Sequence, residues 1–248
     1  MVFVVIGLLG LIVGSFLNCL AWRICNNESF IRGRSKCPRC GQVLKWFELI
    51  PVLSFIIQKA RCRHCREKIS WQYPIVEITM ALLFLLILLK SSNVQYLIFN
   101  IFVICVLAVI FLTDLNFGVI SDWVVWPSAL IIFICQLLLG LSWWRLVLAV
   151  AISGSFFGLQ YVVSRGRWIG AGDIGLGFLM GAILDWPGIL VALVFAYIGG
   201  AIVGLVLILL KKKTLGSAVP FGIFLTPATF IALVWGDKIV VWYQALIK

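Results

Sequence analysis

The stretch "RWIGAGDIGLGFLMGAIL", residues 167–184, constrains the fold more than any other part of the chain. It is an apolar run rich in glycine that carries a single carboxylate, Asp173. The residues from Ile174 to Leu184 would form about 17 Å of helix, which is too short to cross roughly 30 Å of hydrocarbon. A membrane-spanning helix must therefore begin nearer Trp168, which places Asp173 about 8 Å inside the membrane boundary.

The rest of the chain is equally apolar. Of its 248 residues, 63% are hydrophobic and 12% are charged, a composition outside that of soluble domains. The apolar blocks have the length of membrane helices and are too continuous for the alternating strands of a β-barrel. We therefore predict an all-α polytopic membrane protein with about eight transmembrane helices, at 2–21, 74–89, 95–113, 123–140, 144–164, 168–184, 187–210 and 219–243.

The basic residues predict how the chain is oriented. The segment from Arg23 to Lys68 holds eleven of the twenty Lys and Arg residues, and the formal net charge is +11. By the positive-inside rule this segment is cytoplasmic. Arg165, Arg167 and residues 211–213, which follow the fifth and seventh predicted helices, would lie on the same side. Orientation and attraction to the lipid bilayer account for the charge, so no nucleic acid partner is expected.

Four cysteines in this basic segment form two C-x-x-C pairs, Cys37 with Cys40 and Cys62 with Cys65. The pattern is typical of a zinc ribbon, in which each pair supplies two corners of a tetrahedral Zn²⁺ site. Four thiolates close the coordination shell, so the predicted role is structural. The alternative is a pair of disulfides, which are rare in the reducing cytoplasm. His64, the only histidine, is interpreted as a bystander.

These observations divide the chain into three parts. We predict a first transmembrane helix at 1–22, a cytoplasmic Cys-rich zinc-ribbon-like insert between helices 1 and 2 at 23–72, and a transmembrane core at 73–248. Within the insert, "WFELIPVLSFII" at 46–57 is too short to span a membrane and too apolar for a free loop. We expect it to pack on the ribbon or to lie at the membrane surface.

A second carboxylate is predicted near Asp173. The stretch "FLTDLNFGVISDWVVWP", 111–127, places Asp114 at the end of the third predicted helix and Asp122 at the start of the fourth. The topology puts Asp114 and Asp173 on the same side at a similar depth. Two adjacent carboxylates repel each other, so one keeps its proton while the other is ionised. Such a pair can activate water and polarise a peptide carbonyl, as in aspartic proteases.

Other interpretations of Asp173 remain open at this point. Gly170 and Gly172 permit an unwound turn or a close backbone approach, but Asp173 could also be an interfacial residue beside a helix that packs through small residues. Acids within a membrane also occur in ion-coupled transporters, although the chain shows no internal repeat. A further alternative is an intramembrane protease of the G-x-G-D type that cuts signal peptides or membrane stubs, for which no Cys-rich insert is expected.

Several motifs in sequence order point to a known family. The chain resembles the bacterial type IV prepilin leader peptidase/N-methyltransferase family. Members of this family are G-x-G-D intramembrane aspartic proteases. The resemblance covers nearly the whole chain and rests on the double C-x-x-C insert together with "GSFLNCLAWR" at 14–23, "YPIVEI" at 73–78, "DLNFGVISD" at 114–122, "GAGD" at 170–173 and "PFGIFL" at 220–225.

The resemblance implies a function. Family members remove the basic leader peptide from type IV prepilins and pseudopilins at the cytoplasmic face of the inner membrane. Asp114 and Asp173 correspond to the catalytic pair, with Gly170, Gly172 and Asp122 as supporting residues, and 73–248 is then the aspartic peptidase core.

The resemblance also implies that the new N-terminal residue is methylated with S-adenosylmethionine, for which the sequence assigns no binding residues. Acidic side chains such as Glu48 or Glu77 are candidates to meet the basic leader.

Overall fold

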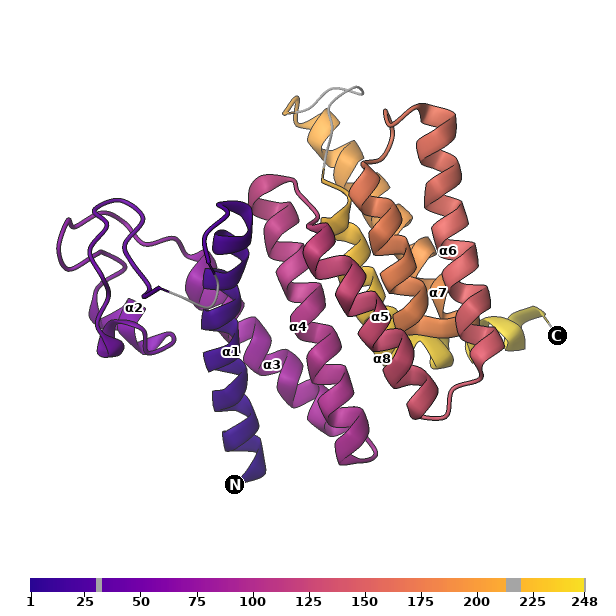
Figure 1. Ribbon diagram of the computed structural model, residues 1–248, viewed down its shortest axis with the longest axis horizontal. Coiled ribbons are helices and arrows are strands. Elements are labelled where there is room, and N and C mark those ends of the chain that lie inside the picture. Colours follow the sequence, from indigo (N-terminus) through magenta and orange to yellow (C-terminus); the bar gives the residue numbers. More distant parts are fainter. Residues whose placement is uncertain (30–32, 213–219, 248) are drawn as a thin grey trace. The chain divides into compact units, whose positions relative to one another are not determined.

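A computed structural model of the chain describes residues 1–29, 33–212 and 220–247, and its regular elements within these ranges are helices (Figure 1). The strand-like pairing in the same ranges consists of two isolated bridges in the Cys-rich insert. The predicted all-helical fold is confirmed. The elements are α1 (Val2–Cys25), η1 (Trp46–Glu48), α2 (Leu53–Ile57), α3 (Gln72–Lys90), α4 (Val94–Phe117), α5 (Asp122–Leu138), α6 (Trp143–Ser164), α7 (Ala171–Leu209) and α8 (Gly222–Ile247).

Six of these helices are long and apolar enough to cross a membrane, namely α1, α3, α4, α6, α7 and α8, and α5 is a shorter apolar helix. Helix α7 has 39 residues and would be about 58 Å long if straight, nearly twice the thickness of the hydrocarbon. It is interrupted at Asp185 and Trp186, whose backbone angles are not helical. The two halves of α7 thus correspond to two of the eight predicted spans.

The second half of α7 folds back beside the first. On α6, Phe157 contacts the position of Gly177 in the first half, while the neighbouring Phe156 packs against Tyr197 in the second half. Residues 177 and 197 lie at similar distances along the chain from the interruption, so the halves form a helical hairpin. The first half, Ala171–Leu184, is much the shorter of the two.

An arginine holds the turn of this hairpin in place. Arg145, at the start of α6, donates hydrogen bonds from Nε (2.9 Å) and Nη2 (2.7 Å) to the carbonyl oxygen of Trp186, and its Nη2 lies 3.0 Å from Oδ2 of Asp185. Asp185 has a φ of 52°, which is uncommon for a residue other than glycine. The ion pair and the two hydrogen bonds therefore stabilise a backbone conformation that the local sequence does not favour.

The chain divides into two compact units, residues 1–105 and 106–248. In the first unit α1 packs closely on α3 through a G-x-x-x-G pattern. A Cβ atom at Gly10 would lie 2.6 Å from Cα of Ala81, and one at Gly14 would lie 2.8 Å from Cα of Glu77. The two backbones thus approach too closely for any larger residue.

In the second unit the first half of α7 is the most buried element, and α5, α6 and α8 all pack against α7. A Cβ atom at Gly181 would lie 2.6 Å from Cα of Val150 on α6. The glycines of the first half therefore serve close helix packing, which was one of the two roles considered for this glycine-rich stretch. Asp173 stands at the start of this tightly packed helix.

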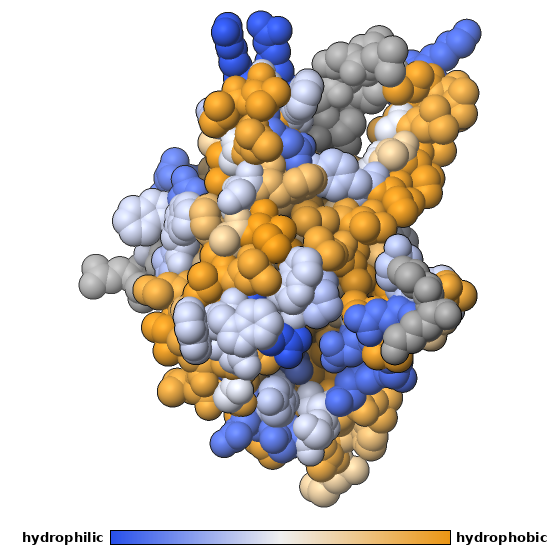
Figure 2. Space-filling view, turned by 90° about the vertical axis from the view of Figure 1, so that its right-hand side faces the viewer, coloured by the Kyte–Doolittle hydropathy of each residue, from blue (hydrophilic) through white to orange (hydrophobic). Residues whose placement is uncertain are grey.

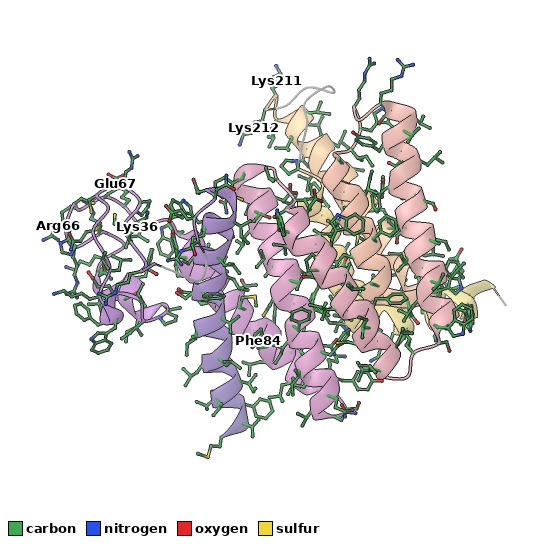
Figure 3. All side chains as sticks on the ribbon, in the orientation of Figure 1. Lys36, Arg66, Glu67, Phe84, Lys211 and Lys212 are labelled. Atoms are coloured by element: carbon green, nitrogen blue, oxygen red, sulfur yellow. The ribbon has the colours of Figure 1, made fainter. Side chains whose placement is uncertain are left out.

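Hydrophobic side chains cover much of the face that carries α6, and hydrophilic side chains project at the end where α6 leads into α7 (Figure 2). Lys211 and Lys212, after α7, lie at this same end of the second unit (Figure 3). Arg165 and Arg167, between α6 and α7, are exposed. The structure therefore places Lys211 and Lys212 at the same end of the second unit as the connection that carries Arg165 and Arg167 (Figure 3), as predicted, and Lys213 lies outside the described residues.

Candidate active site

Asp173 lies in the first turn of α7, where the backbone of the same turn binds its carboxylate. Gly170 is the N-cap, and its N–H donates a hydrogen bond of 2.9 Å to Oδ2 of Asp173. The residue is buried, with 5% of its surface exposed. A carboxylate in this position is also favoured by the helix dipole. The other oxygen, Oδ1, has no hydrogen-bond partner among the described residues.

Asp114 lies in the last turn of α4 and is bound by the start of a different helix. The N–H of Ile223, the second residue of α8, donates a hydrogen bond of 3.0 Å to Oδ2 of Asp114. A Cβ atom at Gly222 would lie only 2.7 Å from the same oxygen. Glycine at position 222 thus lets the N-terminus of α8 reach a carboxylate that is 3% exposed.

The structure brings these two carboxylates together. Asp114 is close enough to Asp173 for their charges to interact. The side chain of Ile120, in the turn between α4 and α5, lies against Gly172, which is next to Asp173, and against Gly222, which contacts Asp114. A Cβ atom at Gly172 would lie 2.8 Å from Cβ of Ile120, and one at Gly222 would lie 3.3 Å from its Cδ1. Gly172 therefore allows close packing next to the pair.

Asp122, the third predicted residue of this group, is exposed rather than buried. It is the first residue of α5, after the N-cap Ser121, and its side chain is exposed. An acidic residue at this position is favoured by the dipole of its own helix. Of the three predicted acids, Asp114 and Asp173 are thus buried, whereas Asp122 is exposed at the start of α5.

Two polar residues near Asp173 were not found from the sequence. Tyr197, in the second half of α7, donates a 2.8 Å hydrogen bond to Oε1 of Gln160 on α6. The ring of Tyr197 packs against Phe221, with 5.0 Å between the ring centroids. The hydroxyl of Tyr197 is close enough to Asp173 for an electrostatic interaction between them. A tyrosine and a glutamine inside otherwise apolar spans were the signal available in the sequence.

The four cysteines of the insert form a second candidate site. The sulfur atoms of Cys37, Cys40, Cys62 and Cys65 all lie within 4.8 Å of one another, and all four thiols are free. The Sγ atoms of Cys37 and Cys65 are 3.9 Å apart, close to the roughly 3.8 Å between neighbouring sulfurs in a tetrahedral site with Zn–S bonds of about 2.3 Å. The cluster could hold a metal ion, and the predicted alternative of two disulfides is not formed.

The two C-x-x-C pairs have the same backbone conformation. The N–H of Cys37 bonds to the carbonyl oxygen of Gln42, and the N–H of Cys62 bonds to that of Glu67, both at 2.9 Å. Backbone N–H groups of Cys65 and His64 hold the pKa of the Cys62 thiol down to about 7, from its ordinary value of 9.0. A lowered pKa favours the thiolate, the form that binds metals.

The apolar segment of the insert, residues 46–57, forms the short helices η1 and α2 and is partly buried. Phe55 is 8% exposed and its ring packs against that of Trp71, with 4.9 Å between centroids. Leu53, Ile56 and Ile57 remain exposed. Of the two predicted arrangements, the contact of Phe55 with Trp71 fits packing within the insert, and a position at the membrane surface stays a prediction for the exposed residues.

Comparison with protein families gives two matches. Residues 8–91 match the family model described as the bacterial peptidase A24 N-terminal domain, and residues 101–205 match the type IV leader peptidase family. The first range contains the four cysteines. The second contains Asp114, Asp122 and Asp173 but ends before the start of α8.

Curated relatives with the name prepilin leader peptidase/N-methyltransferase are similar to the chain over most of its length. The protein of Myxococcus xanthus is 37% identical over 206 residues, which cover 81% of this chain and 62% of the relative. The protein of Bacillus subtilis is 30% identical over 241 residues and 94% of each chain. That of Aeromonas salmonicida is 32% identical over 86% of this chain and 75% of its own. No solved structure matches the chain.

Proposed function

The chain belongs to the type IV leader peptidase family, and we propose that it removes the basic leader peptide from type IV prepilins or pseudopilins. It is a multi-pass membrane peptidase by its family and its apolar helices. The relatives' names favour a peptidase over the ion-coupled transporter considered from the sequence. We assign catalysis to Asp114 and Asp173, within a peptidase core at 73–248.

The observation that carries this assignment is the pairing of two buried carboxylates, each bound by a backbone N–H at a helix N-terminus. Backbone donors fix the position of each carboxylate without adding a competing side chain. The free Oδ1 of Asp173 is available to a water molecule. Such preorganised acids are what general acid–base catalysis of peptide hydrolysis requires.

The proposed reaction uses the two acids in complementary states. The ionised carboxylate takes a proton from a water molecule as the water oxygen attacks the scissile carbonyl carbon. The protonated carboxyl donates a hydrogen bond to the carbonyl oxygen as negative charge develops there. When the C–N bond breaks, a proton passes to the leaving nitrogen and the pair returns to its singly protonated state.

The supporting residues have separate tasks in this proposal. Gly170 donates the hydrogen bond that orients Asp173, and Gly172 allows Ile120 to pack close to the pair. Asp122 stabilises the start of α5 and so the turn that follows Asp114. It takes no direct part in the chemistry, which makes it a matched control for the two catalytic acids.

We also propose that the enzyme methylates the N-terminal residue that cleavage exposes, as the relatives' names suggest. S-adenosylmethionine would supply a methyl group to the neutral amine. Cys37, Cys40, Cys62 and Cys65 would hold a structural Zn²⁺ and so keep the insert, 23–72, folded beyond the first helix, 1–22.

The proposed location is the bacterial inner membrane, with the insert and the active site on the cytoplasmic side. The basic groups between Arg23 and Lys68, and those at the α6–α7 end of the second unit, support this orientation through the positive-inside rule.

Cleavage of a prepilin in membranes tests the proposal. We expect Asp114→Asn and Asp173→Asn to abolish cleavage at wild-type expression levels, because each variant loses one of the two required protonation states. Asp122→Asn should retain most of the activity. Cleavage by both Asp114→Asn and Asp173→Asn at a rate near that of the wild type would refute the assignment.

A further inference from the structure

Gln160, on α6, carries a buried amide nitrogen without a hydrogen-bond partner. Within the described part of the second unit, two buried polar side-chain atoms lack such a partner, Nε2 of Gln160 and Oδ1 of Asp173. Leaving a polar group buried and unpaired is costly, so an unpaired donor in a native structure calls for an explanation. The proposed chemistry uses Oδ1 of Asp173, whereas it leaves Nε2 of Gln160 without a role.

Gln160 lies at about the same level as Asp173 on the neighbouring helix. Helix α6 and the first half of α7 are joined by residues 165–170 and pack against each other, so they are antiparallel. Ser153 on α6 contacts the position of Gly181 on α7. Gln160 follows Ser153 by seven residues, and Asp173 precedes Gly181 by eight, so both lie about two turns from this contact in the same direction. Residues seven apart also share one face of a helix.

A tyrosine fixes the orientation of this amide. The hydroxyl of Tyr197 donates a 2.8 Å hydrogen bond to Oε1 of Gln160. Because the oxygen and the nitrogen of an amide point in different directions, this hydrogen bond also fixes the direction of Nε2. The same hydroxyl is close enough to Asp173 for an electrostatic interaction, and the tyrosine ring is held by its packing against Phe221. A preorganised donor therefore lies close to Asp173.

A second glutamine of the same unit shows how such a side chain serves structure alone. Gln136, on α5, is 8% exposed, and its Nε2 donates a 2.8 Å hydrogen bond to the carbonyl oxygen of Ile183. Its donor is therefore used within the protein. Gln160 differs because, among the described residues, its oxygen has a partner and its nitrogen has none.

A peptide that is cut at membrane level has carbonyl groups that need donors. The carbonyl groups of a helical substrate already accept hydrogen bonds from its own N–H groups, so the segment around the scissile bond must unwind before water can attack it. In apolar surroundings water does not replace the lost hydrogen bonds, and the unwound backbone needs partners from the enzyme. Asp114 and Asp173 act on the scissile carbonyl. A neighbouring carbonyl of the same peptide requires another donor.

We propose that Nε2 of Gln160 donates a hydrogen bond to a backbone carbonyl oxygen of the substrate next to the scissile bond, an inference that rests on the proposed peptidase function. Gln160 is then a substrate-binding residue, and Tyr197 is a positioning residue that acts through it. A backbone carbonyl is present whatever the side chains of the substrate, so the contact fits prepilins of different sequence. Such a hydrogen bond forms in the bound substrate and in the transition state alike, so its loss raises KM and leaves kcat unchanged.

Cleavage kinetics of a type IV prepilin test the proposal, with the full chain in mixed detergent–lipid micelles and the prepilin varied as its mole fraction in the micelle. Gln160→Met keeps the approximate shape of the side chain and removes the amide. We expect KM to rise by about tenfold or more, because a buried substrate carbonyl is left unpaired. The value of kcat should stay within about twofold of that of the wild type.

Two matched controls separate the donor from structural effects. Tyr197→Phe breaks the same internal hydrogen bond but keeps Nε2 of Gln160, so KM should rise by no more than a few fold. Gln136→Met removes a buried glutamine whose donor is already paired with Ile183. This variant should unfold at a lower temperature and keep the KM of the wild type.

A double variant keeps the test decisive if Gln160→Met does not fold. Gln160→Met combined with Tyr197→Phe removes both partners of the internal hydrogen bond, a change that can be nearly neutral for stability. The double variant should unfold close to the wild-type temperature and show the same raised KM, because it still lacks the donor.

The possible results are distinct. A wild-type KM in the folded Gln160→Met or double variant would overturn the inference, while cleavage by the wild type would leave the peptidase function in place. A lower kcat with unchanged KM would also overturn it, because the amide would then act on the scissile carbonyl itself. An equal rise of KM in Gln136→Met would reduce the effect to a loss of structure. No cleavage by the wild type would refute the proposed function and the inference together.

Discussion

The aspartate pair and the cysteine cluster hold reactive side chains in place by different means. Asp114 and Asp173 are fixed by backbone N–H groups at the starts of α8 and α7, within closely packed helices. The cysteines lie in a segment with little regular structure, where two isolated bridges and the turns of the C-x-x-C pairs are the main backbone links. Helix packing organises the first site, whereas the second would depend on the metal ion that we propose the cysteines bind.

Because the two regions are held in place differently, we expect substitutions in them to have different effects. The largest effect is expected at the cysteines. Cys62→Ser should lose the bound metal completely, because a structural zinc site contributes on the order of 10 kcal/mol to folding. Protease should then cut residues 33–71 much faster than in the wild type. Cys25→Ser, outside the cluster, is the control. A folded, protease-resistant insert without metal would contradict the comparison.

The next largest effect is expected from the backbone donor to Asp114. Ile223→Pro removes the N–H but keeps the position in the first turn of α8, where proline is tolerated. Cleavage should fall by about 100-fold, the cost of a misplaced catalytic group, while the metal content stays unchanged. Ile223→Ala keeps the N–H and should cleave at close to the wild-type rate. Equal rates for the two variants would show that the hydrogen bond is unimportant.

A moderate effect is expected at the turn of α7. Arg145→Gln removes the partner of Asp185, whose side chain is 15% exposed. We expect the free energy of unfolding to fall by about 2 kcal/mol. This loss is smaller than for a fully buried ion pair, because Arg145 is partly solvated. Thermal unfolding in nanodiscs measures the loss. Arg167→Gln, an exposed basic residue at the opposite end, should unfold at the wild-type temperature. The same shift in both variants would point to overall charge instead.

The smallest effect is expected at Tyr197. Tyr197→Phe removes one hydrogen bond, to Gln160, worth about 1 kcal/mol, and keeps the ring packed against Phe221. Cleavage should therefore slow by a few fold, with no change in binding of metal to the insert. A loss as large as that of Asp173→Asn would instead place Tyr197 among the catalytic groups.

The sequence predicted the helices and the acids because both depend on local composition. Apolar blocks of membrane-spanning length mark the helices, and the predicted gap between 168–184 and 187–210 coincides with the interruption of α7 at Asp185 and Trp186. Asp114 and Asp173 stood out because carboxylates are costly in apolar surroundings. The cysteines stood out by their spacing.

The contacts that fix these residues could not be predicted in the same way. The N–H of Ile223 meets Asp114 across more than a hundred residues, and every residue other than proline has an N–H, so no side chain marks the donor. Arg145 is one of twenty basic residues in the sequence, and no sequence pattern indicates that it donates hydrogen bonds to the carbonyl oxygen of Trp186. The domain boundaries, the catalytic roles of Asp114 and Asp173, and the supporting roles of Gly170, Gly172 and Asp122 stay predictions.

The short first half of α7 has a consequence for the surrounding lipid. Ala171–Leu184 is about 21 Å long, so it is shorter than the roughly 30 Å of hydrocarbon in a typical bilayer. Such a hydrophobic mismatch is relieved by local thinning of the bilayer. A thinned bilayer would bring the headgroups and water toward Asp173, so the acyl chain length of the host membrane would affect how readily this carboxylate is hydrated.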